Sequence, residues 1–136
     1  KLLTRMINSI DHIVLTVKDI NKTIDFYCNL LGMKYEEFRI NNNSEVRKCL
    51  KFGIQKINLH AYDNIIKPGA KIPKPGTGDI CFISDIDILE WEKIFHNNSI
   101  KIEFGPTKQI GAEGELYSIY IRDPDDNLIE IANRIK

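Results

Sequence analysis

Four side chains of the kinds that bind divalent metals occur in this sequence at matching intervals. His12 and His60 are 48 residues apart (60 − 12), and Asp79 and Glu130 are 51 apart (130 − 79). Aligning DHIVLTV with GDICFIS places Asp79 under His12, and aligning NLHAY with LIEIA places Glu130 under His60. Imidazole together with carboxylate suits Zn²⁺, Fe²⁺, Mn²⁺, Ni²⁺ or Co²⁺ better than Ca²⁺. If two copies of one unit pack about a pseudo-two-fold axis, all four groups converge on one metal site.

Glu130 lies on the second strand of a predicted hairpin that spans about residues 119–133. The turn of this hairpin is Asp-Pro-Asp-Asp-Asn, whose residue types favour turns through side-chain capping, a fixed φ and tolerance of positive φ. Because side chains alternate along a strand, Glu130 shares a face with Leu128 and Ala132. A carboxylate on a partly buried face needs a partner, and a metal ion is one candidate.

The elements that would position these groups follow the same order in both halves of the chain: strand, helix, three strands. Asp19 and Asp85 are the predicted N-caps of the two helices, and Gly32 is placed to end the first. The expected strands are 10–17, 33–40, 45–52, 56–62, 79–84, 100–104, 115–122 and the second strand of the hairpin, and the expected helices are about 20–31 and 86–97. The modules are then about 9–63 and 78–134 of one domain, 1–136, with a proline-rich linker at 64–77 and a loop at 105–114 that holds Lys108 and Gln109.

Composition narrows the possible functions. The 19 basic residues equal the 19 acidic ones, so no long-range field recruits nucleic acid or an anionic membrane. No apolar run approaches the roughly 20 residues of a membrane span, and the start of the chain lacks a signal-peptide pattern. The three cysteines are scattered and odd in number, which indicates reduced thiols in a cytoplasmic protein.

The segments IDHIVLTVKDINKTIDFYCNLLGMK and SIYIRDPDDNLIEI resemble those of the vicinal oxygen chelate superfamily, over about residue 9 to the end of the chain. This superfamily includes glyoxalase I, fosfomycin-resistance and bleomycin-resistance proteins and extradiol dioxygenases, and the chain looks nearest to glyoxalase domain-containing proteins. The resemblance implies an α+β fold of two βαβββ modules that form a cup-shaped mixed β-sheet with helices outside. It further implies a divalent metal in the cup, with His12, His60, Glu130 and Asp79 at ligand positions.

Two departures from the family pattern affect the site. Glyoxalase I-like enzymes show the order His, Glu, His, Glu or Gln, whereas this chain shows His, His, Asp, Glu. If the shorter Asp79 does not reach the metal, the remaining set is His12, His60 and Glu130, which matches a two-histidine, one-carboxylate site with open positions. Asp126 stands in the turn where the family usually has Gly.

The resemblance implies a lyase or isomerase of a small oxygen-chelating metabolite, with Glu130 moving the proton and Tyr120 resembling a substrate-contacting tyrosine. Ser118 and Arg122 share the parity of Tyr120, although Arg122 also suits an ion pair with Asp123 that braces the turn. The alternatives are a metal-dependent dioxygenase or fosfomycin-resistance-type transferase, and a metal-free small-molecule binding protein. A homodimer is expected from the same resemblance.

Overall fold

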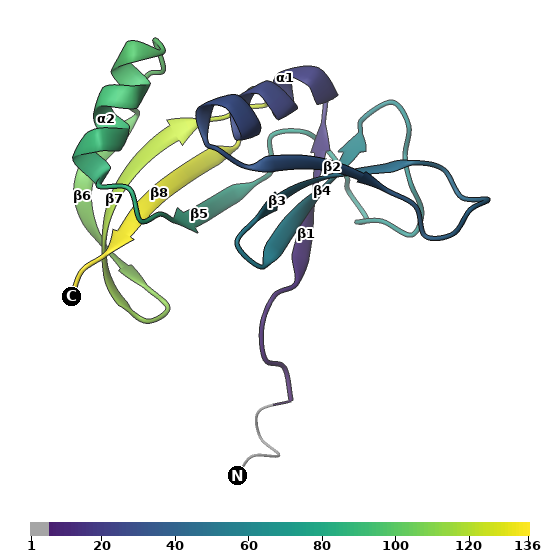
Figure 1. The fold of residues 1–136 in the computed structure, drawn as a ribbon, viewed down its shortest axis with the longest axis horizontal. Helices are drawn as coiled ribbons and strands as arrows, with labels where there is room; N and C mark the ends of the chain where they lie inside the picture. The colour runs from purple at the N-terminus through teal and green to yellow at the C-terminus, as the bar shows by residue number, and fades with distance from the viewer. Residues whose placement is uncertain (1–5) are drawn as a thin grey trace. The chain divides into compact units, whose positions relative to one another are not determined.

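The computed structural model describes residues 6–136, which divide into two compact units, one that ends at Pro75 and one that spans Gly76–Lys136. We refer to them as the N-terminal and C-terminal units. Each contains one strand, one helical segment and three further strands, in that order (Figure 1). The predicted pair of βαβββ modules is therefore confirmed.

The N-terminal unit is a four-stranded mixed sheet with the strand order β1-β4-β3-β2, in which β1 and β4 run parallel. Its elements are β1 His12–Val17, α1 Ile20–Ile24, the π-helical segment η2 Asp25–Leu30, β2 Lys34–Phe38, β3 Arg47–Phe52 and β4 Gln55–Ala61. Asp19 caps α1 as predicted, since its carboxylate accepts a hydrogen bond from the Lys22 backbone N–H at 3.0 Å. Gly32 follows the helical segment with φ of 81°, the left-handed conformation that glycine adopts without strain.

The two faces of this first sheet differ in chemistry. One face is apolar and buries residues from three strands: Leu15, Val17, Leu50, Ile57 and Leu59. Strand alternation places polar side chains on the other face, among them His12 and His60. The apolar face forms the core of the unit, and the candidate site residues lie on the opposite face.

The C-terminal unit repeats this topology with the strand order β5-β8-β7-β6 and a parallel β5–β8 pair. Its elements are β5 Asp79–Ile83, α2 Ile88–Asn97, β6 Phe104–Gly111, β7 Gly114–Arg122 and β8 Leu128–Arg134. Helix α2 contacts β7 and β8 (Figure 1). Its buried residues are Ile88, Trp91 and Phe95. Asn133 of β8 accepts a hydrogen bond from the Ile88 backbone N–H at 2.8 Å, which fixes the start of this helix on the sheet.

Two local predictions in this unit are wrong. The N-cap of α2 is Asp87, not Asp85, because the Asp87 carboxylate accepts the Leu89 backbone N–H at 2.8 Å. The predicted loop at 105–114 is mostly strand β6, which pairs with β7. Gly105, with φ of 96°, lies in an irregularity after Phe104, and regular pairing resumes at Thr107.

Two residues that were predicted to lie in the loop at 105–114 therefore lie in a strand. Lys108 and Gln109 belong to β6, opposite Tyr117 and Leu116. Lys108 also approaches Glu115 at 3.6 Å, an exposed ion pair within the hairpin. Among residues 6–136, each helix is too short or too polar to cross a bilayer.

Candidate functional site

Glu130 lies between two hydrogen-bond donors on one face of the C-terminal sheet. Strand register places it directly opposite Tyr120 of β7 and directly opposite Cys81 of β5. Burial, and then a hydrogen bond to Glu130, raise the pKa of Tyr120 to about 12. Desolvation, followed by the negative charge of Glu130, raises the pKa of the Cys81 thiol to about 12. Both side chains therefore keep their protons at neutral pH and donate toward one carboxylate.

Asp79 is the exposed first residue of β5 and lies opposite Leu128. It shares a strand face with Cys81, two residues later, and its negative charge contributes to the raised pKa of both Cys81 and Tyr120. The C-terminal unit thus brings together the predicted residues Asp79, Tyr120 and Glu130. Cys81 was not predicted as a site residue, although it lies two residues after Asp79 in DICFI, and this spacing puts both on one strand face.

His12 begins β1 in the N-terminal unit and is held by its neighbour. Its ring Nδ1 lies 2.8 Å from a carboxylate oxygen of Asp11, and the His12 side chain is 42% exposed. A carboxylate on one ring nitrogen fixes the orientation of the imidazole and leaves Nε2 for a ligand, as is common for metal-binding histidines. The hydrogen bond to His12 also lowers the pKa of Asp11. Asp11 was not predicted as a site residue, although it directly precedes His12 in the sequence.

His60 lies at a different level of the same sheet. It pairs with Thr16, whereas His12 pairs with Lys56, so four residues separate the two histidines along the parallel strands. At about 3.3 Å per residue this is about 13 Å. Burial, and then the positive charge of Arg47, lower the pKa of His60. The N-terminal unit therefore does not bring His12 and His60 together.

The register also changes the equivalence of the two units. His12 pairs with Lys56, and Asp79 pairs with Leu128. If His12 and Asp79 are equivalent, Lys56 and Leu128 are equivalent as well. Two residues further along the later strand stand Asn58 in the N-terminal unit and Glu130 in the C-terminal unit. The alignment that placed Glu130 under His60 was wrong by two residues, and Asn58 is the counterpart of Glu130.

A hollow of about 340 Å³ opens on the N-terminal unit near the start of β1. Its lining combines charged, polar and apolar side chains: Asp11, Glu36, Phe38, Cys49, Lys51, Ile54, Gln55 and Lys56. The Lys56 ammonium lies 3.9 Å from the centre of the Phe38 ring, and Lys51 approaches Glu36 at 3.8 Å. The two ammonium groups thus already have partners within the unit.

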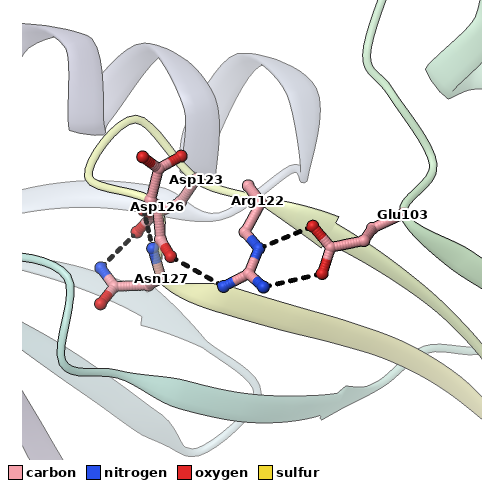
Figure 2. A network of polar contacts seen from close by, with 5 residues as sticks. All are labelled: Glu103, Arg122, Asp123, Asp126 and Asn127. Atoms are coloured by element: carbon pink, nitrogen blue, oxygen red, sulfur yellow. Dashed lines mark hydrogen bonds and ion pairs between the residues drawn. The ribbon is translucent and has the colours of Figure 1, made fainter.

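The hairpin turn that precedes Glu130 is held by a polar network (Figure 2). Arg122 forms a two-pronged ion pair with Glu103, at 3.0 and 2.7 Å, and donates to the Asp126 carbonyl at 3.0 Å. This replaces the predicted pairing of Arg122 with Asp123. Asp123 instead accepts hydrogen bonds from the backbone and the side chain of Asn127 at 2.9 and 2.8 Å. The network fixes the turn, and through it the register that sets Glu130 opposite Tyr120.

Among residues 6–136, no three His, Cys, Asp or Glu side chains gather closely enough to hold a metal ion. The candidate ligands nevertheless show local order within each unit. His12 has an orienting carboxylate, and Asp79 and Glu130 lie on one face of neighbouring strands.

Comparison with known proteins identifies the family. The model of the glyoxalase/bleomycin resistance protein/dioxygenase superfamily matches residues 9–131. The chain belongs to this superfamily. It is 43% identical over 127 residues to a glyoxalase domain-containing protein, RDO1, of Mycosarcoma maydis, covering 93% of this chain and 69% of that protein. The resemblance stated from the sequence is confirmed.

Two further relatives extend the comparison. Virulence protein STM3117 of Salmonella typhimurium is 46% identical over 130 residues, covering 96% of this chain and 87% of that protein. Its crystal structure superposes with a TM-score of 0.89, covering 96% of this chain and 99% of that chain. The metallothiol transferase FosB of Staphylococcus saprophyticus is 29% identical over 126 residues, covering 93% of this chain and 77% of that protein. These similarities show the superfamily fold along nearly the whole chain.

Proposed function

We propose that this protein is a divalent-metal-dependent glyoxalase-like enzyme, a lyase or isomerase that acts on a small metabolite with two adjacent oxygens. The observation that supports this most directly is the arrangement around Glu130, which has a phenol and a thiol opposite it and Asp79 on the same face. Membership of a superfamily that includes glyoxalases and dioxygenases, together with these two carboxylates on one face, supports catalysis over metal-free binding.

The residues proposed as metal ligands are His12 of the N-terminal unit and Asp79 and Glu130 of the C-terminal unit. The fit rests on donor chemistry and on the Asp11–His12 contact, which orients the imidazole. His60 belonged to the predicted set, but its place four residues from His12 along the strands disfavours it. A bound divalent ion would act as a Lewis acid that stabilises negative charge on substrate oxygens.

Proton movement is proposed for Glu130, with Tyr120 as its partner. Glu130 is the carboxylate positioned to take a proton from a substrate carbon and return it to a neighbouring atom. Tyr120 remains protonated at neutral pH because its pKa is raised to about 12, so it donates a hydrogen bond and does not serve as a base. Cys81 is held as a thiol in the same way and orients the other side of the carboxylate.

The test begins with metal analysis of protein purified without chelators, followed by Mn²⁺ titration monitored by electron paramagnetic resonance. We expect about one ion per site, and we expect Glu130→Gln to weaken Mn²⁺ binding by at least about tenfold. The matched control is Glu115→Gln, an exposed glutamate of the same sheet whose partner is Lys108. Its Mn²⁺ affinity should equal that of the wild type.

Acetohydroxamate, which offers two adjacent oxygens, serves as a probe of open coordination positions. It should bind the Mn²⁺-loaded wild type and change the water-proton relaxation of that complex. Equal Mn²⁺ affinity in wild type and Glu130→Gln would refute the proposal.

A second candidate, transfer of a thiol to an electrophilic substrate, is favoured by the match to a metallothiol transferase over 93% of this chain. The two candidates differ in stoichiometry. A transferase consumes one free thiol per turnover and forms a carbon–sulfur bond, whereas an isomerase leaves the total thiol concentration unchanged. Measuring thiol loss with a colorimetric reagent during turnover separates them.

We further propose a homodimer in the cytoplasm. The three cysteines are free thiols in the structure, as expected in a reducing compartment. Sedimentation equilibrium, which gives the mass independently of shape, distinguishes a dimer from the 15.7 kDa monomer.

A further inference from the structure

Three lysines face one another across the N-terminal sheet. Strand register sets Lys34 of β2 opposite Lys51 of β3, and Lys51 opposite Lys56 of β4. Directly opposite residues in antiparallel strands have Cβ atoms about 4.5–5.5 Å apart, and like charges at such positions are destabilising. This row of ammonium groups therefore needs a reason other than the stability of the sheet.

Carboxylates near the row compensate only part of its charge. Glu36 is shared by Lys34 and Lys51, at 3.3 and 3.8 Å, and both distances exceed that of a close charge-assisted hydrogen bond. The Asp11 carboxylate, which also lines the hollow of this unit, lies 2.8 Å from the ring Nδ1 of His12. One carboxylate thus neutralises at most one of the two ammonium groups beside it.

The ammonium group of Lys56 has an aromatic ring as its partner. It lies 3.9 Å from the centre of the Phe38 ring, and no ion pair of Lys56 occurs within residues 6–136. The residue is half-buried. A ring attracts a cation but carries no negative charge, and a partly buried charge without a counterion is unfavourable. An anion bound next to Lys56 would supply the missing charge.

The hollow of about 340 Å³ in the N-terminal unit opens beside Lys51 and Lys56. Its volume is at the lower end of the range of small-molecule sites, roughly 300–1,000 Å³. Its wall also contains the half-buried ring of Phe38 and the fully exposed side chain of Ile54. Two ammonium groups beside an apolar wall suit a small molecule that carries a doubly charged group on a short apolar body.

We propose that this hollow binds a small organic dianion, a phosphate monoester or a dicarboxylate, with its negative charge at Lys51 and Lys56 and its apolar part against Phe38 and Ile54. The site goes beyond the proposed function, because it needs no metal ion and no residue of the C-terminal unit. The whole chain is neutral, with 19 residues of each sign, so the attraction comes from the local grouping of lysines and not from a net charge.

The test measures the binding of phenyl phosphate and of phthalate to the full chain by isothermal titration calorimetry, with phenol as the neutral comparison. The measurement is made at about pH 8, where a phosphate monoester carries two charges. At least one dianion should bind about tenfold more tightly than phenol, and the better of the two identifies the anionic group. If neither dianion binds, or if phenol binds as tightly as both, the inference is overturned.

Substitutions then locate the site. Lys56→Gln should weaken binding of the better dianion about tenfold, because water screens a half-buried ammonium group little. Lys51→Gln should weaken it about threefold, since the Lys51 side chain is 50% exposed. The matched control is Lys93→Gln, which removes the same charge from an exposed lysine of α2 that pairs with Glu90, and its affinity should equal that of the wild type. Equal affinity in the wild type and Lys56→Gln would contradict the inference.

Urea unfolding separates a binding role from a structural one. Lys51 is the middle lysine of the row, so Lys51→Gln removes both like-charge contacts and, without ligand, should have an equal or higher urea midpoint than the wild type. The better dianion should raise the midpoint of the wild type more than that of Lys56→Gln. A markedly lower midpoint of ligand-free Lys51→Gln would mean that the row stabilises the fold, and would overturn the inference.

The Glu130→Gln variant distinguishes this site from the proposed metal site. It is expected to lose Mn²⁺ affinity and to bind the dianion as the wild type does. If its dianion affinity falls together with its Mn²⁺ affinity, the metal holds the anion and this inference is wrong, while the proposed function stands. If Glu130→Gln keeps its Mn²⁺ affinity, the proposed function is wrong, and unchanged dianion binding still supports the site at Lys51 and Lys56.

Discussion

Asn127 offers a quantitative test of how the turn before Glu130 is held. Its side chain is 1% exposed and bridges two parts of the C-terminal unit. The Asn127 Oδ1 atom accepts the backbone N–H of Gly78 at 2.6 Å, and its Nδ2 donates to Asp123 at 2.8 Å. The substitution Asn127→Ala removes both contacts and leaves the backbone bond from residue 127 to Asp123 in place.

The expected loss follows from the groups that would remain. Asp123 is 4% exposed, so one of its carboxylate oxygens would lose a donor with little access to water. A hydrogen bond to a charged group contributes roughly 1.5–3 kcal/mol, and a neutral one roughly 0.5–1.5 kcal/mol. Allowing for partial rescue by water, we expect Asn127→Ala to lower the free energy of unfolding by about 3 kcal/mol.

Urea unfolding monitored by circular dichroism measures this change. The control is Asn29→Ala, because Asn29 also donates to an aspartate four residues away, Asp25, but both side chains are exposed. That control should change the free energy of unfolding by less than about 0.5 kcal/mol, since exposed pairs contribute little. A loss of under about 1 kcal/mol in Asn127→Ala, or equal losses in both variants, would refute the reasoning.

Two further predictions concern the backbone and pH. Gly105→Ala should be destabilising by more than about 2 kcal/mol, because its Cβ would lie 2.6 Å from the Ser118 carbonyl oxygen at positive φ. Gly32→Ala, also at positive φ but with open space around the Cβ, should cost only about 1 kcal/mol in the same urea assay. Because burial and Arg47 lower the pKa of His60 in the folded state, the unfolded chain binds more protons near pH 6, and stability should fall as pH drops through about 6.5. His60→Gln should flatten this part of the stability–pH curve, and an unchanged curve would contradict the assignment.

Local signals in the sequence predicted much of the fold because they depend on chemistry within a few residues. Asp19 caps α1 and Gly32 follows the helical segment in the left-handed conformation, as expected. Asp126 replaces the glycine expected from the family and adopts φ of 65°, a conformation that aspartate tolerates better than most residues. The family preference for glycine at this point therefore has a backbone cause.

Strand β6 was missed because glycine and proline were interpreted as a loop. Gly105 and Pro106 instead form an irregularity after Phe104, and Thr107 resumes the pairing with Ser118. Nothing local distinguishes a bulge from a loop, because the evidence for pairing lies in β7, about ten residues away along the hairpin. A signal that depends on a partner strand is weak in a single sequence.

The two-residue error in aligning β4 with β8 has the same origin. Sliding β4 by two residues keeps every side chain on its original face, so the pattern of apolar and polar residues cannot detect the error. The alignment was then chosen by residue type, and His60 was matched with Glu130 because histidine is a more common metal ligand than asparagine. The deciding register is that of β4 against the parallel strand β1, which sets His12 opposite Lys56. The correspondence between positions in the two units thus depends on pairing with a neighbouring strand, which residue types within the strand do not reveal.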